Sequence, residues 1–303
     1  MRDEAERKAD SEAVEVGARR CRDAEGVTLH EAVDEAERRL IAAGIEAAPI
    51  DVQLLVEKAL GLSRTELVLN RERALTVEEF REIERLVARR ANREPLAYVL
   101  GEWGFRRLTL KVDNRVLVPR PETEGVVERC LELIGDVEQP SVLDVGTGSG
   151  AIALAIADER PDAQVTAIDV SPGALELARD NARTTGLDVD FEQRDVREGL
   201  EGTYDLVVSN PPYVTAEEIE QLEPEVRDWE PRLATVGDEH TAVIASAATG
   251  VLVSGGHLVL EVAAGRGEEV TELLRSLGYA DVRVTNDLTG RDRVVDGRWS
   301  SGR

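Results

Sequence analysis

The sequence of 303 residues contains two cysteines, three histidines and no long apolar run. Cys21 and Cys130 can form at most one disulfide bond, and the histidines are scattered, so we predict no metal site. A membrane-spanning helix needs about 20 consecutive apolar residues, which the sequence lacks, and an integral membrane protein of that kind is excluded. The charged first residues also lack the apolar stretch of a secretory signal. We therefore expect a reduced, cytoplasmic protein without a membrane partner.

Basic residues are outnumbered, with 37 Lys and Arg against 61 Asp and Glu, which gives a net charge of −24. Such a balance repels the phosphate backbone, which nucleic-acid-binding proteins neutralise with basic patches. We therefore expect no direct contact with nucleic acid. The charge also resembles the acidic surface of salt-adapted proteins. A saline source is a hypothesis, which equal solubility and stability with and without molar salt would contradict.

Local patterns predict a helical domain that follows a short N-terminal extension. Residues 1–25 are charged and rich in alanine, and we expect a disordered extension there. Thr28–Glu31 and Thr76–Glu79 each have the spacing of a capping box, in which a threonine and a glutamate cap the first turn of a helix. Apolar residues follow both boxes at helical intervals. These signals predict a helical domain over residues 26–100.

A change of period separates this region from the rest of the chain. Apolar and polar residues alternate after residue 101, which is typical of a strand, and Asp113-Asn114 interrupts them with a turn signal. We therefore predict a β-hairpin linker over residues 101–118 that turns at this pair. The alternating apolar residues are Leu108, Leu110, Val112, Val116 and Val118.

Strands and helices alternate over residues 119–303, which predicts an α/β fold with a doubly wound, mostly parallel sheet. The predicted strands are 141–145, 164–169, 189–192, 204–209, 257–261, 282–285 and 293–295. The main predicted helices are 151–158, 173–184, 242–253 and 268–277. Ligands of such sheets bind at the carboxyl ends of the strands, so residues that follow a strand are the candidates for a site.

A glycine-rich loop follows the first of these strands, where glycines let the backbone turn sharply and approach a ligand closely. Asp169 ends the next strand, and a carboxylate there can accept hydrogen bonds from both ribose hydroxyls of a nucleoside. The spacing G-x-G-x-G differs from the G-x-G-x-x-G of nicotinamide-binding loops and suits S-adenosylmethionine, which has no pyrophosphate. A tight turn without a ligand is the alternative, which the position of Asp169 disfavours. The candidate cofactor-binding loop comprises Gly146, Thr147, Gly148, Ser149 and Gly150.

A weaker candidate follows the third predicted strand. Asp195 comes after Arg194 at a position from which a carboxylate could reach the amino group of adenine. An ordinary acidic loop residue fits the same position nearly as well, so this assignment stays open.

The tetrapeptide Asn210, Pro211, Pro212 and Tyr213 follows the strand predicted at 204–209. The prolines end the strand and offer no N–H donor, so the loop presents the Asn210 side-chain oxygen and the Pro211 carbonyl as acceptors. Two acceptors that hold both hydrogens of a planar nitrogen orient its lone pair toward a methyl donor and stabilise the developing positive charge. The face of Tyr213 adds a cation–π contribution of about 0.5–2 kcal/mol. The pattern predicts methylation of an amide or aromatic amine.

Three alternatives to this interpretation remain open. The tetrapeptide could be a surface turn that happens to be rich in proline. An enzyme that methylates exocyclic amines of adenine or guanine in nucleic acid could use the same chemistry, with Tyr213 stacked on a flipped base, although the net charge of −24 opposes it. A non-catalytic protein could also retain the nucleoside-binding fold as a docking module.

Several segments together resemble the HemK/PrmC family of release-factor glutamine methyltransferases, and the resemblance covers about residues 28–298. Asn-Pro-Pro-Tyr occurs in many amino-methylating enzymes, whereas the segments upstream of the glycine loop are more specific. The matching segments are Arg93–Tyr98, Gly101–Glu102, Phe105, Pro119–Glu124, Gly146–Gly150, Asn210–Tyr213 and Leu288–Val295.

The resemblance implies a class I S-adenosylmethionine-dependent methyltransferase fold. It implies methyl transfer from S-adenosyl-L-methionine to the side-chain amide nitrogen (N5) of the glutamine in the Gly-Gly-Gln motif of class I peptide chain release factors. The helical domain would dock the release factor, Asp169 would hold the cofactor ribose, and Asn210 with Pro211 would bind the glutamine amide. The segment Pro119–Glu124, including Arg120 and Glu122, would belong to the active-site wall, and it is equally compatible with a proline-fixed turn that opens a helix. We also expect a monomer.

The sequence departs from the family pattern in three loops. Val196 stands where the family often has an aromatic residue against adenine, and we expect Val196 to make a weaker contact there. Residues 237–241 replace a more glycine-rich stretch, and Arg266 stands where the family commonly has glutamine. These departures concern details of the loops rather than the reaction.

Overall fold

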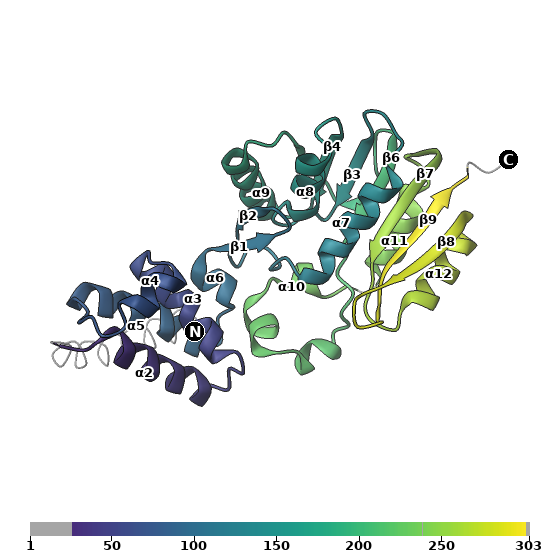
Figure 1. Cartoon of the computed structure of the whole chain (residues 1–303). Helices are drawn as coiled ribbons and strands as arrows, with labels where there is room; N and C mark the ends of the chain where they lie inside the picture. The colour runs from purple at the N-terminus through teal and green to yellow at the C-terminus, as the bar shows by residue number, and fades with distance from the viewer. Residues whose placement is uncertain (1–25, 238, 301–303) are drawn as a thin grey trace. The chain divides into compact units, whose positions relative to one another are not determined.

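The computed structural model describes residues 26–237 and 239–300 (Figure 1). The extension expected over residues 1–25, which contains Cys21, lies outside the described residues. The chain divides into two compact units between Leu100 and Gly101. Within the ranges described, no helix combines the length and the apolar character needed to cross a bilayer.

The N-terminal unit is helical, as predicted. Thr28, Ser63 and Thr76 each accept a hydrogen bond from the backbone N–H of a glutamate three residues later, whose side chain accepts one from the backbone N–H of the cap. These reciprocal bonds satisfy backbone donors that lack partners within a helix, and so they fix where three helices begin. The helices are α2 (Leu29–Ala42), α3 (Ala48–Leu60), α4 (Arg64–Leu69), α5 (Val77–Ala91) and α6 (Leu96–Leu100).

A β-hairpin is present after Leu100, but its predicted turn was wrong. Strands β1 (Glu102–Phe105) and β2 (Leu108–Lys111) pair in an antiparallel manner. The chain therefore reverses at Arg106 and Arg107, and Arg106 adopts a left-handed conformation with φ of 51°. The polar pair Asp113-Asn114 lies beyond the second strand rather than between the strands.

The segment that follows β2 explains why this turn signal was misleading. The Asp113 carboxylate accepts a 3.0 Å hydrogen bond from the Arg115 backbone N–H and a 2.7 Å bond from the Arg115 guanidinium. Asp113 thus stabilises a local turn. Val116, predicted to lie in a strand, is instead buried against Ala174 and Leu177.

The larger unit contains a seven-stranded sheet in the order β5-β4-β3-β6-β7-β9-β8 (Figure 1). Strands β5 to β7 of this order are parallel, and β9 is antiparallel to both β7 and β8. The mostly parallel, doubly wound sheet of an S-adenosylmethionine-dependent methyltransferase fold is therefore confirmed. The strands are β3 (Ser141–Val145), β4 (Gln164–Asp169), β5 (Asp190–Gln193), β6 (Tyr204–Ser209), β7 (Leu252–Glu261), β8 (Tyr279–Asn286) and β9 (Asp292–Trp299).

Helices cover both faces of the sheet. Successive residues of a strand point to opposite faces, so Val142 packs with residues of α7 and α8, while Leu143 packs with residues of α11 and α12. Both core clusters are apolar and fix the strands whose ends carry the site. The helices of this unit are α7 (Pro121–Leu133), α8 (Ala151–Glu159), α9 (Pro172–Thr185), α10 (Arg232–Thr235), α11 (His240–Ala248) and α12 (Gly267–Ser276), with short turns at Val196–Glu198, Glu218–Gln221 and Glu225–Trp229.

The helix predicted over residues 242–253 was too long. Helix α11 ends at Ala248, and Leu252 already belongs to β7, where it pairs with Tyr204. The backbone N–H of Gly250 donates to the Ala247 carbonyl in the turn between the two elements. The apolar composition continues across this turn, so hydrophobic periodicity alone did not mark the boundary.

Candidate active site

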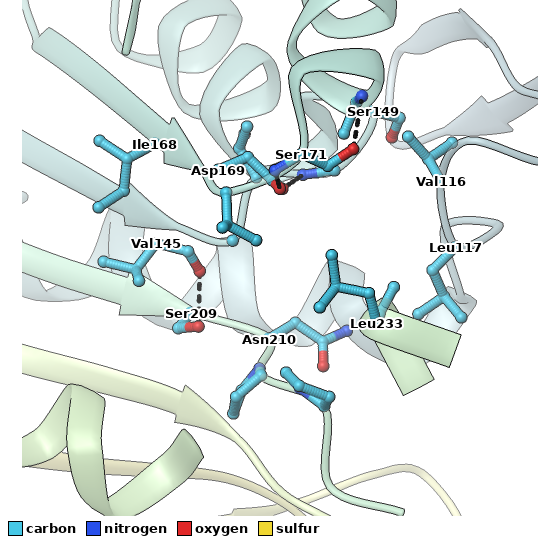
Figure 2. A pocket seen from close by; sticks show the side chains of 18 of the residues that line it. Val116, Leu117, Val145, Ser149, Ile168, Asp169, Ser171, Ser209, Asn210 and Leu233 are labelled. Carbon is cyan, nitrogen blue, oxygen red and sulfur yellow. Dashed lines mark hydrogen bonds between the residues drawn. The ribbon is translucent and has the colours of Figure 1, made fainter. Parts of the chain in front are cut away.

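A cleft opens at the carboxyl ends of β3, β4 and β6 and encloses about 1210 Å³, open solvent included (Figure 2). It brings together most of the predicted site residues although they come from separate loops. The predicted residues that line it are Arg120, Gly146, Thr147, Gly148, Ser149, Asp169, Asp195, Val196, Asn210, Pro211 and Pro212. Gly150, Glu122 and Tyr213 do not line this cleft.

The glycine loop follows β3 and leaves room for a ligand. Gly146 and Gly148 have φ of 76° and 57°, and a Cβ atom added to either would meet no protein atom within 4 Å. Gly150 differs, because a Cβ atom there would lie 3.1 Å from Leu154 and 3.3 Å from Ala178. Gly146 and Gly148 therefore present bare backbone beside the cleft, whereas Gly150 permits close packing of α8 against α9.

Asp169 is held in place by backbone donors at the end of β4 (Figure 2). Its two carboxylate oxygens accept hydrogen bonds from the Gly148 N–H at 2.9 Å and the Ser171 N–H at 2.8 Å. Burial raises the pKa of Asp169, and these backbone donors oppose the increase. A carboxylate offers about four acceptor sites over its two oxygens, so Asp169 retains acceptor capacity for a ligand.

Asp195 has the position that the sequence predicted but a different set of contacts. Both of its carboxylate oxygens accept hydrogen bonds from the Arg197 guanidinium, at 2.6–3.0 Å, and one accepts from the Arg197 backbone N–H. The Arg197 guanidinium lowers the pKa of Asp195 to about 2. Arg197 thus occupies much of the acceptor capacity that Asp195 would offer to adenine. Val196 is buried and lines the cleft beside it.

Asn210 extends from the end of β6 into the cleft, on the side opposite Asp169 in Figure 2. Its side-chain Nδ2 donates a 3.2 Å hydrogen bond to the Thr123 hydroxyl, which donates a 2.7 Å bond to the Glu261 carboxylate. Burial raises the pKa of Glu261 to about 7. The preceding Ser209 is buried and donates to the Val145 carbonyl at 2.6 Å, which fixes the end of β6 against β3.

Tyr213 lines a neighbouring cavity of about 580 Å³, open solvent included, rather than the cleft that Asn210 lines. This second cavity is also lined by Val262, Arg266 and Val270. Burial raises the pKa of Tyr213 to about 12, so its hydroxyl is protonated at neutral pH. The Tyr213 side chain therefore borders the second cavity and is not among the residues that line the cleft of Asn210.

An ion pair fastens the loop that follows the tetrapeptide. The Arg120 guanidinium donates to both oxygens of Glu230 at 2.7 Å, and Glu230 also accepts a 3.3 Å bond from the Val118 backbone N–H. Glu230 is buried, whereas its neighbour in sequence Pro231 lines the cleft. The predicted wall residue Glu122 is exposed. The next residue, Thr123, lines the cleft instead.

Sequence analysis placed Thr123 only within the wall segment Pro119–Glu124, without a role of its own, and it assigned no role in the site to Glu230 or Glu261. A usable signal existed for Glu261, because it ends the strand that follows β6 in the sheet and is therefore at a carboxyl end. Among the residues described, no group of three or more His, Cys, Asp and Glu side chains is arranged to hold a metal ion.

Comparisons with known proteins match most of the chain. Residues 31–101 match the family model described as PrmC N-terminal domain, and residues 129–225 match the one described as Methyltransferase small domain. A release factor glutamine methyltransferase of Deinococcus radiodurans is 41% identical over 280 residues, covering 90% of this chain and 99% of the relative. One from Caulobacter vibrioides is 40% identical over 278 residues, covering 89% and 96%. A solved methyltransferase structure from Pyrococcus furiosus is 20% identical, with a TM-score of 0.47 over 65% of this chain and 90% of that one.

Proposed function

The chain belongs to the PrmC/HemK family of release factor glutamine methyltransferases, and from this premise we propose how its cleft performs the reaction. The substrate is the glutamine of the Gly-Gly-Gln motif in class I release factors, and the methyl group is added to the side-chain amide nitrogen (N5). One observation carries this proposal. Asn210 at the end of β6 and Asp169 at the end of β4 line the same cleft.

The cleft residues fit S-adenosyl-L-methionine, which supplies an electrophilic methyl group when bound. Gly146 and Gly148 leave open the space that a Cβ atom would fill, and Asp169 keeps acceptor capacity for two ribose hydroxyls. Val196 contributes an apolar contact for the adenine ring. Asp195 contributes less to binding, because Arg197 already engages both of its oxygens.

The tetrapeptide binds and activates the glutamine amide. The nitrogen of the glutamine amide is a poor nucleophile because its lone pair is delocalised into the carbonyl group. The Asn210 Oδ1 and the Pro211 carbonyl accept the two amide hydrogens, which turns the lone pair toward the methyl donor and stabilises the positive charge on nitrogen in the transition state. No strong base is needed, since the methylated nitrogen is acidic and loses its proton late. Pro212 and Tyr213 keep the loop in its conformation.

The helical unit of residues 26–100 docks the release factor, and the protein acts as a cytoplasmic monomer without contact to nucleic acid. The match of residues 31–101 to a domain model of this family supports a role specific to the family. Arg120 supports the substrate loop through its ion pair with Glu230.

Incubation with methyl-labelled S-adenosylmethionine tests the proposal. The enzyme is given an equimolar mixture of a class I release factor and bulk tRNA or DNA. We expect label on the release factor, and its loss when the Gly-Gly-Gln glutamine is replaced by alanine. Label on nucleic acid would instead identify an exocyclic-amine methyltransferase, and no label on either would indicate a non-catalytic protein.

A further inference from the structure

Behind Asn210 lies a short chain of hydrogen bonds that joins three distant parts of the sequence. Asn210 Nδ2 donates to the Thr123 hydroxyl at 3.2 Å, and that hydroxyl donates to Glu261 at 2.7 Å. Ser209 and Leu260 pair across β6 and β7, so the residues that follow them, Asn210 and Glu261, lie at the same sheet edge. Thr123 and Glu261 are only 4% and 1% exposed, so the contact between them is shielded from solvent.

The donors and acceptors of these hydrogen bonds permit only one orientation of the Asn210 amide while Glu261 is ionised and accepts from Thr123. A carboxylate can only accept hydrogen bonds, and a hydroxyl has a single hydrogen to donate. Thr123 gives that hydrogen to Glu261, so toward Asn210 its oxygen acts as an acceptor. The amide end that faces Thr123 must therefore be the NH₂ group, and Oδ1 is the end left for other partners.

We propose that Thr123 and Glu261 are positioning residues that set the orientation of the Asn210 amide and so hold its Oδ1 as the acceptor for the substrate nitrogen. This inference rests on the proposed function, because it assigns a direction to the contact between Asn210 and the glutamine amide. We call the two hydrogen bonds from Asn210 to Thr123 and from Thr123 to Glu261 the relay. Without the relay, the Asn210 amide can rotate by half a turn and present its NH₂ group to a substrate that itself offers N–H groups. Two donors would then face each other, and the lone pair of the substrate nitrogen would lose its orientation.

The charge of Glu261 makes the relay sensitive to pH. The pKa of Glu261 is raised to about 7, chiefly by burial and to a smaller extent by Glu122, whereas the hydrogen bond from Thr123 and the charges of Arg293 and Arg120 oppose the increase. Burial, and to a smaller extent the charge of Glu261, raises the pKa of Tyr213 to about 12, so Tyr213 is neutral in this range. Glu261 is therefore the group in this cluster that titrates near neutral pH.

Protonation of Glu261 allows the opposite direction of hydrogen bonding within the relay. A protonated Glu261 can donate to the Thr123 oxygen, which frees the Thr123 hydrogen to bond with Asn210 Oδ1. The amide orientation that activates the substrate is then no longer enforced. Turnover is thus expected to fall as pH decreases through about 7, while the affinity for S-adenosylmethionine changes little.

Three variants with a matched control test the relay by kinetics. Thr123→Val keeps the shape but removes the hydroxyl, and kcat should fall about tenfold or more with the dissociation constant of S-adenosylmethionine within about twofold. Thr123→Ser restores the hydroxyl and most of the rate. Thr271→Val removes a buried hydroxyl that has no hydrogen-bond partner and should leave kcat unchanged. Glu261→Gln should abolish the pH dependence of kcat near 7. Equal kcat in Thr123→Val and Thr271→Val would overturn the proposal.

A spectroscopic measurement separates failure of the relay from failure of the proposed function. The side-chain amide signals of Asn210, assigned by their loss in Asn210→Asp, can be followed by ¹⁵N–¹H NMR between pH 5.5 and 8.5. These signals should shift with an apparent pKa of about 7 in the wild type and stay constant in Glu261→Gln.

A wild type that methylates no release factor refutes the proposed function, yet the amide titration still tests the relay. Signals that do not titrate, or that titrate equally in Glu261→Gln, would overturn the relay even in an active enzyme. If Thr123→Val does not fold, the rate of Thr123→Ser and the titration in Glu261→Gln still decide the question.

Discussion

In the proposed mechanism Asn210 acts as an acceptor toward the substrate nitrogen, so the reaction should be sensitive to the loss of its amide. Asn210→Ala removes that acceptor while the backbone of the loop remains fixed by two prolines. We expect kcat to fall about 100-fold or more, the scale of losing one preorganised polar contact to a transition state. Affinity for S-adenosylmethionine should change much less. Steady-state kinetics with a saturating release factor measure the first effect, and calorimetric titration measures the second.

The control for this variant is Asn286→Ala, which removes an amide that bonds the Gly290 carbonyl in the exposed turn between β8 and β9. Its kcat should match that of the wild type. A near-normal kcat in Asn210→Ala would remove Asn210 from its proposed role.

Asp169 and Asp195 both line the cleft, but their contacts predict different contributions to cofactor binding. Asp169 retains acceptor capacity on both oxygens, whereas Arg197 engages both oxygens of Asp195. Asp169→Asn should therefore weaken S-adenosylmethionine binding about tenfold or more, since it removes a charge-assisted contact. Asp195→Asn should weaken it less than about threefold. Calorimetric titration of both variants checks the difference, and an equal loss in the two would contradict this assignment.

Individual residues also show where prediction from sequence ends. The glycine loop, Asp169 and Asn210 could be predicted to lie together because each ends or directly follows a recognisable strand, and parallel strands bring their carboxyl ends to one edge. Thr123 contacts Asn210 across 87 positions of sequence and Glu261 across 138. Such contacts depend on the order of β6 and β7 and on where α7 packs, and neither is encoded in the local pattern around Thr123.

At the scale of elements, the ion pair between Arg120 and Glu230 ties the start of α7 to the loop before α10. Glu230 is buried and its pKa is raised by burial, while Arg120 opposes the increase. Arg120→Met leaves the carboxylate without this partner and raises its pKa further. The folded state is then penalised as pH rises through that pKa, and the penalty disappears when Glu230 is protonated. We expect a loss of about 1–3 kcal/mol in the free energy of unfolding at pH 8 and a smaller loss at pH 5.

Urea unfolding at the two pH values measures this effect, and Arg120→Met/Glu230→Gln should recover part of the stability. Arg227→Met is the control, because Arg227 pairs with the half-exposed Asp228 and such surface pairs contribute little. A loss in Arg120→Met that is larger at pH 5 than at pH 8 would show that Glu230 is not the group responsible.

Elements were predicted well where a strand or helix has sharp ends and poorly where it does not. Strands β3, β4 and β6 have the predicted bounds because turn-forming or polar residues flank short apolar runs. The hairpin turn was misplaced because Asp113-Asn114 has the composition of a turn between strands but serves a different local turn. The boundary between α11 and β7 was missed because apolar residues continue across it. Composition therefore predicted the type of element more reliably than the point where one element gives way to the next.

At the scale of the whole molecule, the proposed cofactor-binding cleft and the proposed docking region belong to separate units. Every residue that lines the main cleft lies in the unit that begins at Gly101, and the apolar core of the helical unit contains only residues before it. Each unit therefore has its own core, as an independently folding domain requires.

Expression of residues 101–303 alone tests whether the larger unit binds the cofactor by itself and whether the helical unit docks the substrate. Because the main cleft and both cores of the larger unit are intact in this fragment, it should fold cooperatively and bind S-adenosylmethionine within about threefold of the full chain. Without residues 26–100, KM for the release factor should rise about tenfold or more, since the proposed docking contacts are gone. A short peptide with the Gly-Gly-Gln sequence is the matched control, because it is too small to need the docking unit and should be methylated equally by both proteins. An unchanged KM for the intact release factor would contradict the docking role of the helical unit and assign substrate recognition to the methyltransferase unit alone.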